Sequence, residues 1–285
     1  MKPNITDFLK RNYSFRRLIS LFLFSGIICS TSQAETLRFD QLTWTEINQK
    51  LREGTSNIIL PIGGTEQSGP FIAVGKHTER VSILSEKIAE TVGHTLVAPP
   101  IAFVPEGNTN PRTSHMRFPG TISIPPSVFS ELITSTTESF CVQGFKNIFL
   151  IGDHGGYQKQ LQSISHNFNQ KYNYGNCRLI YIPDYYQATQ QPFDLLLKQQ
   201  GYGNAIGQHA DIKDTSLMLA TNPEYVRLNN LHQATRFDPS MGIYGGNPRQ
   251  ASKTLGEAGI TLQIKATVTA IKNLLNSASF KEKGK

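Results

Sequence analysis

The stretch NIILPIGGTEQSGP, residues 57–70, joins an apolar run to a loop that carries polar side chains. The run NIILPI is typical of a strand that is buried on both faces of a parallel sheet. A pair of glycines ends it, and Glu66 and Ser68 follow within the loop. In open parallel sheets, ligands bind beyond the carboxyl ends of the strands. The stretch therefore predicts a buried strand that leads into a functional loop.

The same pattern recurs along the chain. NIFLIG (147–152) is a second apolar run, and DHGG (153–156) follows it as a loop. Two more strands are predicted at 95–104 and 177–183. Helical spacing and capping residues predict helices at 80–93, 125–144 and 157–172, another around 214–220, and a last one from about residue 248. Strands that alternate with helices predict one α/β domain with a mostly parallel sheet.

The first 34 residues have the pattern of a secretory signal. A basic segment ending in SFRR precedes the apolar run LISLFLFSGIIC, and Ser32 and Ala34 supply the small residues before a cleavage site. We expect cleavage after Ala34, a mature domain of residues 35–285, and a periplasmic or secreted location. No membrane association is expected after cleavage. The alternative is an uncleaved membrane anchor.

Charge and cysteine content limit the function further. The formal net charge is +7, but much of the excess lies in residues 1–34 and the remaining positive residues are scattered. This pattern predicts no nucleic-acid partner, which would need a clustered basic face. Cys141 and Cys177 remain in the mature chain. They could pair in an oxidising compartment, and two buried free thiols are an equally good interpretation.

Seven carboxylate and imidazole residues lie in or near the loops and helix starts at the predicted edge of the sheet. Together these groups are typical ligands of a divalent metal. The glycines after His154 allow close backbone approach. No phosphate-binding loop, dinucleotide fingerprint or serine-hydrolase elbow follows a strand, which argues against those enzyme classes. The seven residues are Glu66, His77, Asp153, His154, His209, Asp211 and Asp214.

Five segments, in order, resemble motifs of the creatininase (creatinine amidohydrolase) family. They are LPIGGTEQSGP, RFPGTISI, GDHGG, HADIKDTSLMLA and GGNPRQAS, within residues 43–275. The resemblance implies a three-layer α/β/α fold and a homo-oligomer. It also implies hydrolysis of a C–N bond in a small cyclic or linear amide, with one or two divalent metals.

The chain departs from the family pattern at several ligand positions. Glu66 matches the family's glutamate, but Ser68 stands at the histidine of the second metal and His77 at the bridging aspartate. His154 matches the metal-binding histidine of the third motif, and Asp214 replaces a glutamate of the fourth. The resemblance therefore implies a rebuilt site with one divalent ion, zinc or manganese. Its predicted ligands are Glu66, His77, His154 and Asp214.

The remaining roles also follow from the resemblance. A metal-bound water would attack the amide, and His209 would carry the proton to the leaving nitrogen. We expect Asp153 to assist in catalysis. Contacts with the substrate are predicted for Ser68, His115, Gly155, Gly156 and Asp211. The alternative is a non-catalytic small-molecule-binding protein on the same fold, because two ligand positions have changed.

Overall fold

The computed structural model describes residues 36–172 and 174–282, with the side chains of 278–282 left aside. The predicted signal peptide lies outside these residues. The described residues from Thr36 onward belong to one compact unit. Within the described part of the chain, no helix combines the length and the apolar character needed to cross a membrane.

The core of the fold is a four-stranded sheet in the order β2-β1-β3-β4. All three strand pairs are parallel. The second strand is shorter than predicted, because Pro99 and Pro100 follow it closely and proline has no N–H for a sheet hydrogen bond. The strands are β1 (Asn57–Ile62), β2 (Thr95–Val97), β3 (Asn147–Gly152) and β4 (Arg178–Tyr181).

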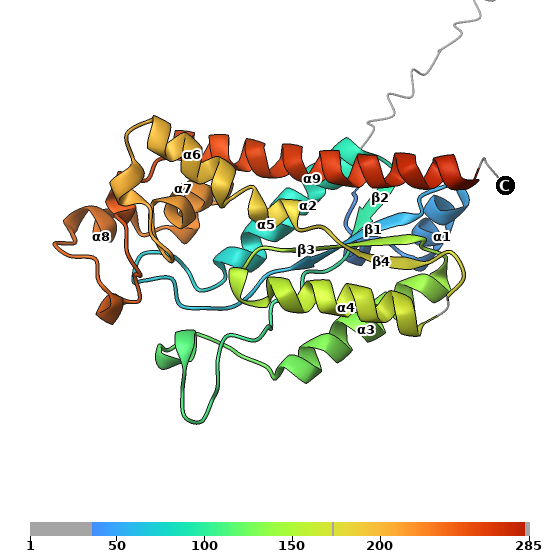
Figure 1. Cartoon of the computed structure of the whole chain (residues 1–285), viewed down its shortest axis with the longest axis horizontal. Helices are drawn as coiled ribbons and strands as arrows, with labels where there is room; N and C mark the ends of the chain where they lie inside the picture. The colour runs from blue at the N-terminus through green and yellow to red at the C-terminus, as the bar shows by residue number, and fades with distance from the viewer. Residues whose placement is uncertain (1–35, 173, 283–285) are drawn as a thin grey trace, which may run out of the picture. The chain divides into compact units, whose positions relative to one another are not determined.

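Helices cover both faces of this sheet. Figure 1 shows α2, α5 and α9 over one face and α3 and α4 over the other, so the predicted three-layer α/β/α fold is confirmed. The helices are α1 (Trp44–Arg52), α2 (Lys76–Val92), α3 (Pro126–Gln143), α4 (Gln158–Lys171), α5 (Asp184–Gln187), α6 (Gln191–Gln199), α7 (Ile212–Thr221), α8 (Leu228–Gln233) and α9 (Lys253–Glu282).

The alternation of side chains along each strand divides the apolar core between the two faces. Ile59 packs in a cluster with Val81 of α2, whereas Ile58 belongs to a cluster with Phe129 of α3 and Leu161 of α4. All of these side chains are fully buried. Strand β1 is therefore covered on both sides, as its continuous apolar run predicts.

A disulfide bond joins Cys141, near the end of α3, to Cys177, just before β4. The sequence left open whether these cysteines are paired or free thiols, and the structure shows that they are paired. The bond ties one of the covering helices to the edge strand of the sheet.

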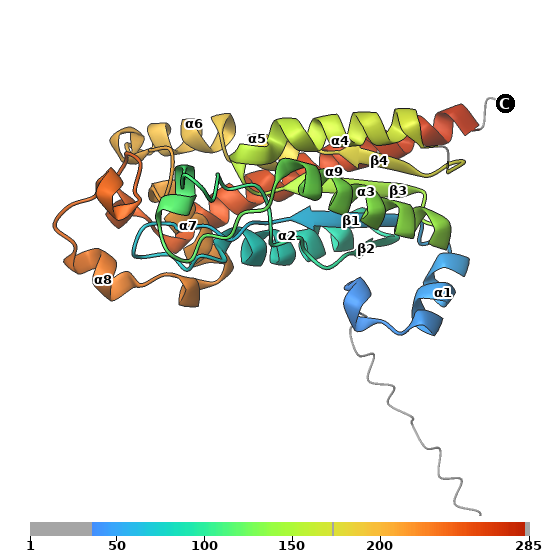
Figure 2. The ribbon, with the colours of Figure 1, turned by 90° about the horizontal axis from the view of Figure 1, so that it is seen from below.

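The register of β1 and β3 places two loops side by side. Ile62, the last residue of β1, pairs with Gly152, the last residue of β3. The loops that begin at Gly63 and Asp153 therefore leave the sheet at the same edge. In Figures 1 and 2, α6, α7 and α8 gather beyond this edge of the sheet.

Candidate active site and metal centre

The loop after β1 turns inward and buries Glu66. A β-carbon at Gly63 would lie 2.5 Å from the Cα of Thr78, so only glycine allows the loop to pass so close to α2. At Gly64, φ is +152°, and a β-carbon there would lie 3.0 Å from Oε1 of Glu106. The two glycines thus bring the loop against α2 and against a second carboxylate. Glu66 ends with no exposed surface.

Four residues from separate segments meet at this point, and we call them the four-residue cluster: Glu66, Glu106, His115 and His154. One ligand atom from each lies within 4.8 Å of the others, so the group could hold a metal ion. Nε2 of His115 lies 3.1 Å from Oε2 of Glu66, and Nε2 of His154 lies 3.3 Å from the same oxygen. Nδ1 of His154 faces Oε1 of Glu106 at 3.5 Å.

Three of the four carboxylate oxygens of the cluster have no hydrogen-bond partner among the described residues. Oε2 of Glu66 and both side-chain oxygens of Glu106 are buried without a partner. Burial, together with the nearby charge of Glu66, raises the pKa of Glu106 to about 9. A buried carboxylate without a donor is costly unless a cation compensates it. The cluster therefore fits a divalent ion that accepts both oxygen and nitrogen ligands.

The two histidines of the cluster are suited to metal binding at neutral pH. Burial lowers the pKa of His154 to about 4. Burial also lowers the pKa of His115. Neutral imidazole has the lone pair that a metal ligand needs.

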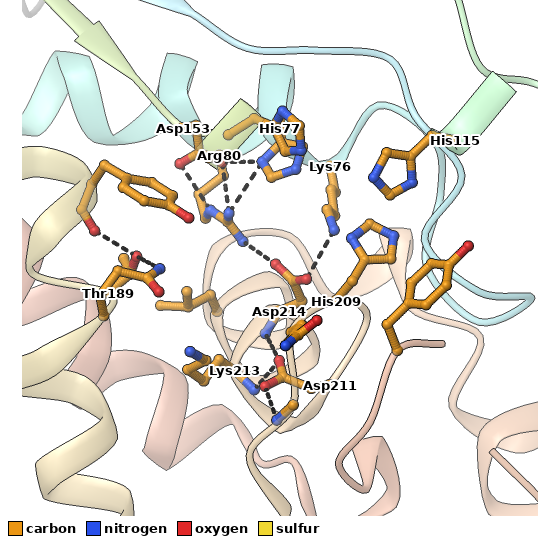
Figure 3. A pocket seen from close by; sticks show the side chains of 18 of the residues that line it. Lys76, His77, Arg80, His115, Asp153, Thr189, His209, Asp211, Lys213 and Asp214 are labelled. Carbon is orange, nitrogen blue, oxygen red and sulfur yellow. Dashed lines mark hydrogen bonds and ion pairs between the residues drawn. The ribbon is translucent and has the colours of Figure 1, made fainter. Parts of the chain in front are cut away.

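A second buried group lies next to the cluster, and we call it the paired network: Lys76, His77, Arg80, Asp153 and Asp214 (Figure 3). His77 lies in the first turn of α2 rather than in the preceding loop. It donates from Nε2 to Oε1 of Glu66 at 2.8 Å and from Nδ1 to Oδ2 of Asp153 at 2.6 Å. Burial and the charge of Lys76 lower its pKa, but the two carboxylates outweigh them and the pKa of His77 is raised.

Asp153 has a full set of donors. Its Oδ1 accepts from Nε of Arg80 at 3.0 Å and from the hydroxyl of Tyr185 at 2.8 Å. Its Oδ2 lies 2.6 Å from Nη2 of Arg80 as well as 2.6 Å from His77. Burial raises the pKa of Asp153, but Arg80 and His77 lower it more strongly. Asp153 is therefore an ionised carboxylate that holds other side chains in place.

Asp214 is also paired with cations. Nζ of Lys76 donates to its Oδ2 at 2.9 Å, and Nη1 of Arg80 lies 3.6 Å from its Oδ1 (Figure 3). Against the effect of burial, these two charges lower the pKa of Asp214 well below its usual value. Asp214 and His77, both predicted as metal ligands, thus lie outside the four-residue cluster.

His209 lies between the two groups. Its Nε2 donates to the backbone oxygen of Gln67 at 2.8 Å, and its Nδ1 is 3.6 Å from Oε1 of Glu66. Burial, followed by the charge of Lys76, lowers the pKa of His209 to about 3. The ring is therefore neutral at neutral pH, with Nδ1 unprotonated.

Two residues beside the site histidines have a left-handed backbone. Ser114, before His115, has φ of +48°, and Ala210, after His209, has φ of +53°. Non-glycine residues rarely adopt this conformation, and such strain is often found at functional sites. The backbone at both histidines is thus held in a conformation that local preference disfavours.

A cavity of about 590 Å³ opens beside both groups, and Lys76, His115, His154, Gly155 and His209 are among its lining residues. Asp211, another predicted substrate contact, also lines this cavity.

Ser68 is buried, its hydroxyl has no hydrogen-bond partner among the described residues, and it is not part of the lining described for this cavity. Asp211 caps α7, accepting from the backbone N–H groups of Lys213 and Asp214. Gly156 donates its N–H to Nδ1 of His154 at 3.3 Å.

Sequence reasoning missed three residues of this site. Glu106 follows the second predicted strand, so the rule that selected Glu66 and His154 could have selected it too. Lys76 and Arg80 gave no signal, because charged residues at the start of a helix usually face solvent.

A comparison with models of known protein families gives one match that spans most of the described residues. The creatininase family model, described as creatinine amidohydrolase, matches residues 40–271. The chain therefore belongs to the creatininase family. This confirms the family predicted from the five segments.

Two curated relatives are hydrolases by name. A 3-dehydro-scyllo-inosose hydrolase of Thermotoga maritima is 29% identical over 189 residues, which cover 66% of this chain and 57% of that protein. The match thus spans little more than half of that relative's length. A creatinine amidohydrolase of Pseudomonas putida is 21% identical over 210 residues, or 70% of this chain and 78% of that protein.

A solved structure described as creatininase Mn has the same fold. Its TM-score is 0.70 at 19% sequence identity, and the match covers 84% of this chain and 98% of that one. At this identity the likeness supports the fold alone.

Proposed function

We propose that this chain is a metal-dependent hydrolase that cleaves a C–N bond in a small cyclic or linear amide, using one divalent ion. The observation that carries the proposal is the set of buried carboxylate oxygens without donors, on Glu66 and Glu106, beside two neutral imidazoles. Membership of the creatininase family and the names of the relatives support the same reaction class.

The four-residue cluster would hold the ion, and zinc and manganese both suit its oxygen and nitrogen donors. This changes the proposed roles of two residues. His77 and Asp214 were expected to be ligands, but each is already bonded to oppositely charged partners in the paired network. Glu106 and His115 take their place beside Glu66 and His154. When bound, the ion would polarise the amide carbonyl and lower the pKa of a water molecule.

His77 and Asp153 would act by positioning Glu66. Asp153 holds one nitrogen of the His77 ring, and the other nitrogen holds Oε1 of Glu66. This leaves Oε2 directed at the two histidines of the cluster. Partners that orient a metal ligand in this way typically change metal affinity or activity by about 10–100-fold when they are removed.

His209 would move the proton. Its Nε2–H is fixed by the backbone oxygen of Gln67, so Nδ1 carries the lone pair and faces Glu66. Nδ1 can accept a proton from the attacking water. The lowered pKa then favours passing that proton to the leaving nitrogen.

The cavity supports a small, polar substrate. Besides the charged residues, hydrogen-bonding side chains of Ser114, Tyr186, Gln190, Gln208 and Tyr244 line it. Such a lining favours a molecule with several polar groups over an apolar one.

We also propose that the protein is exported and acts in the periplasm or outside the cell. The signal pattern of residues 1–34 and the Cys141–Cys177 disulfide support this location, because disulfides persist in oxidising compartments. Assembly into homo-oligomers stays a prediction from the family resemblance.

The proposal is tested by metal analysis and turnover. Protein purified without chelator is expected to contain one equivalent of zinc or manganese by elemental analysis and to hydrolyse a member of a panel of small cyclic and linear amides. Glu257→Gln, on the exposed side of α9, is the matched control for Glu66→Gln. A chain that binds panel members without metal and without turnover would instead be the non-catalytic binding protein.

A further inference from the structure

Among the described residues, Lys76 is unusual because its ammonium group is fully buried. Its side chain has no exposed surface, although lysine is almost never fully buried unless it is paired. Nζ lies 2.9 Å from Oδ2 of Asp214 and 3.3 Å from Oε1 of Glu66. The side chain starts from the first residue of α2 and lines the cavity.

Glu66 connects this ammonium to the four-residue cluster. Its Oε1 faces Lys76 and His77, whereas its Oε2 faces His115 and His154. Oε1 of Glu66 therefore lies next to the ammonium of Lys76, and Oε2 lies next to the two histidines that are proposed to bind the ion. The two positive charges would lie at neighbouring positions along one wall of the cavity.

The need to compensate the charges of Asp214 and Glu66 does not by itself explain a buried lysine at position 76, because both carboxylates have other partners. Oδ2 of Asp214 also accepts the backbone N–H of Ala210 at 2.9 Å, and Arg80 lies near its other oxygen. Oε1 of Glu66 accepts from His77. Nζ of Lys76 donates a hydrogen bond to Asp214 and lies within ion-pair distance of Glu66. Lys76 is also one of the residues that line the cavity, so its ammonium charge lies beside a molecule bound there.

We propose that Lys76 is a built-in second cation of the active site, which stabilises the negative charge that develops on the substrate oxygen during hydrolysis. This inference rests on the proposed hydrolase function. The ammonium keeps its protons throughout and acts by charge and hydrogen bonding. In a site closed off from water, a fixed donor of this kind is worth far more than in solution, and losing one typically lowers kcat by about 10²–10³-fold.

Two substitutions separate this role from a purely structural one. Lys76→Met keeps the volume and removes the charge. In the metal-loaded enzyme it is expected to lower kcat by about 10²–10³-fold, with KM within about threefold of the wild type. Lys253→Ala, which removes an exposed lysine of α9, should leave both constants unchanged. A Lys76→Met enzyme with kcat within about threefold of wild type would overturn the proposal.

A second measurement needs neither metal nor turnover. Lys76→Ala leaves two buried carboxylates facing a space that a small cation can enter from the cavity. Methylammonium chloride is expected to raise the Tm of metal-free Lys76→Ala above its value in sodium chloride of equal ionic strength, and to have no such effect on the wild type. Absence of this difference would also overturn the proposal. If the wild type binds no metal, the hydrolase function fails while this measurement still reports on the cation position.

Discussion

The four-residue cluster and the paired network lie side by side and are both largely buried, and Glu66 of the cluster contacts His77 and Lys76 of the network. Their hydrogen bonding nevertheless differs. In the paired network each carboxylate has at least two donors or cations within reach. In the cluster, Oε2 of Glu66 and both side-chain oxygens of Glu106 have no hydrogen-bond partner among the described residues.

The difference shows which buried charges belong to the fold and which are suited to a ligand. A buried charge network with all its bonds formed makes the local structure rigid, because breaking one pair leaves the other charge uncompensated. A buried acceptor without a donor costs stability in the free protein and recovers it when a cation binds. Substitutions in the two regions should therefore have different signatures, in stability for one and in metal binding for the other.

The largest effect is expected at Glu66, the cluster residue that contacts the paired network. Glu66→Gln should abolish metal retention and turnover, because it removes a proposed ligand and weakens the bonds of His77 and Lys76 to that ligand. Even changes to the partners of a ligand typically cost about 10–100-fold in affinity. Elemental analysis and amide hydrolysis measure both. Retention of one metal equivalent would show that the cluster is not the metal centre.

His209→Ala should keep the metal and lower kcat by about 10²–10⁴-fold, because His209 is proposed to move a proton rather than to bind the ion. Since the pKa of His209 is lowered to about 3, the wild-type kcat should show no limb from this ring between about pH 5 and pH 8. Metal content and a pH–rate profile test both parts. Loss of the metal would place His209 among the ligands.

Asp153→Asn should destabilise the fold, by about 3–5 kcal/mol at pH 7, because it leaves buried Arg80 and His77 without their main counter-charge. The folded pKa of Asp153 is lowered, so its stabilisation is present above its unfolded pKa of about 4 and is lost as the pH falls through the folded value. Urea unfolding should show a smaller difference from the wild type at pH 3 than at pH 7. A difference that grows on acidification would contradict the pairing described for this network.

Glu106→Gln should have the smallest effect, and its sign should depend on the metal. The folded pKa of Glu106 is raised to about 9, so its contribution to the stability of the metal-free protein is full below pH 4.5 and is lost as the pH rises towards 9. The metal-free variant should therefore be more stable than the wild type at pH 8, by about 1–3 kcal/mol. With metal added, the wild type should gain more in Tm than the variant does. Equal gains would remove Glu106 from the cluster.

The parts of the molecule that could be predicted from sequence are those with a local signal. Strands β1 and β3 were evident because they are continuous apolar runs ended by glycine-containing loops, and these loops led to Glu66 and His154. The motif resemblance identified the family and the layers of the fold.

Other parts of the site depend on contacts distant in sequence. Glu106 reaches the cluster through an irregular loop that carries no periodic pattern, and Gly64 gives it space from the other side. Lys76 and Arg80 are buried because Asp153 and Asp214, far along the chain, neutralise them. His77 was expected to be a metal ligand from its place in a motif, and the motif could not show that two carboxylates occupy both of its nitrogens.

The common end of β1 and β3 has a consequence for how such a protein can change over time. The loops that follow β1 and β3 supply Glu66 and His154 to the four-residue cluster, and the segment between β2 and α3 supplies Glu106 and His115. A substitution in one of these segments can thus exchange a ligand atom of the cluster without changing a strand or the apolar layers. The sheet and its covering helices can therefore be kept while the residues of the cluster are replaced, one segment at a time.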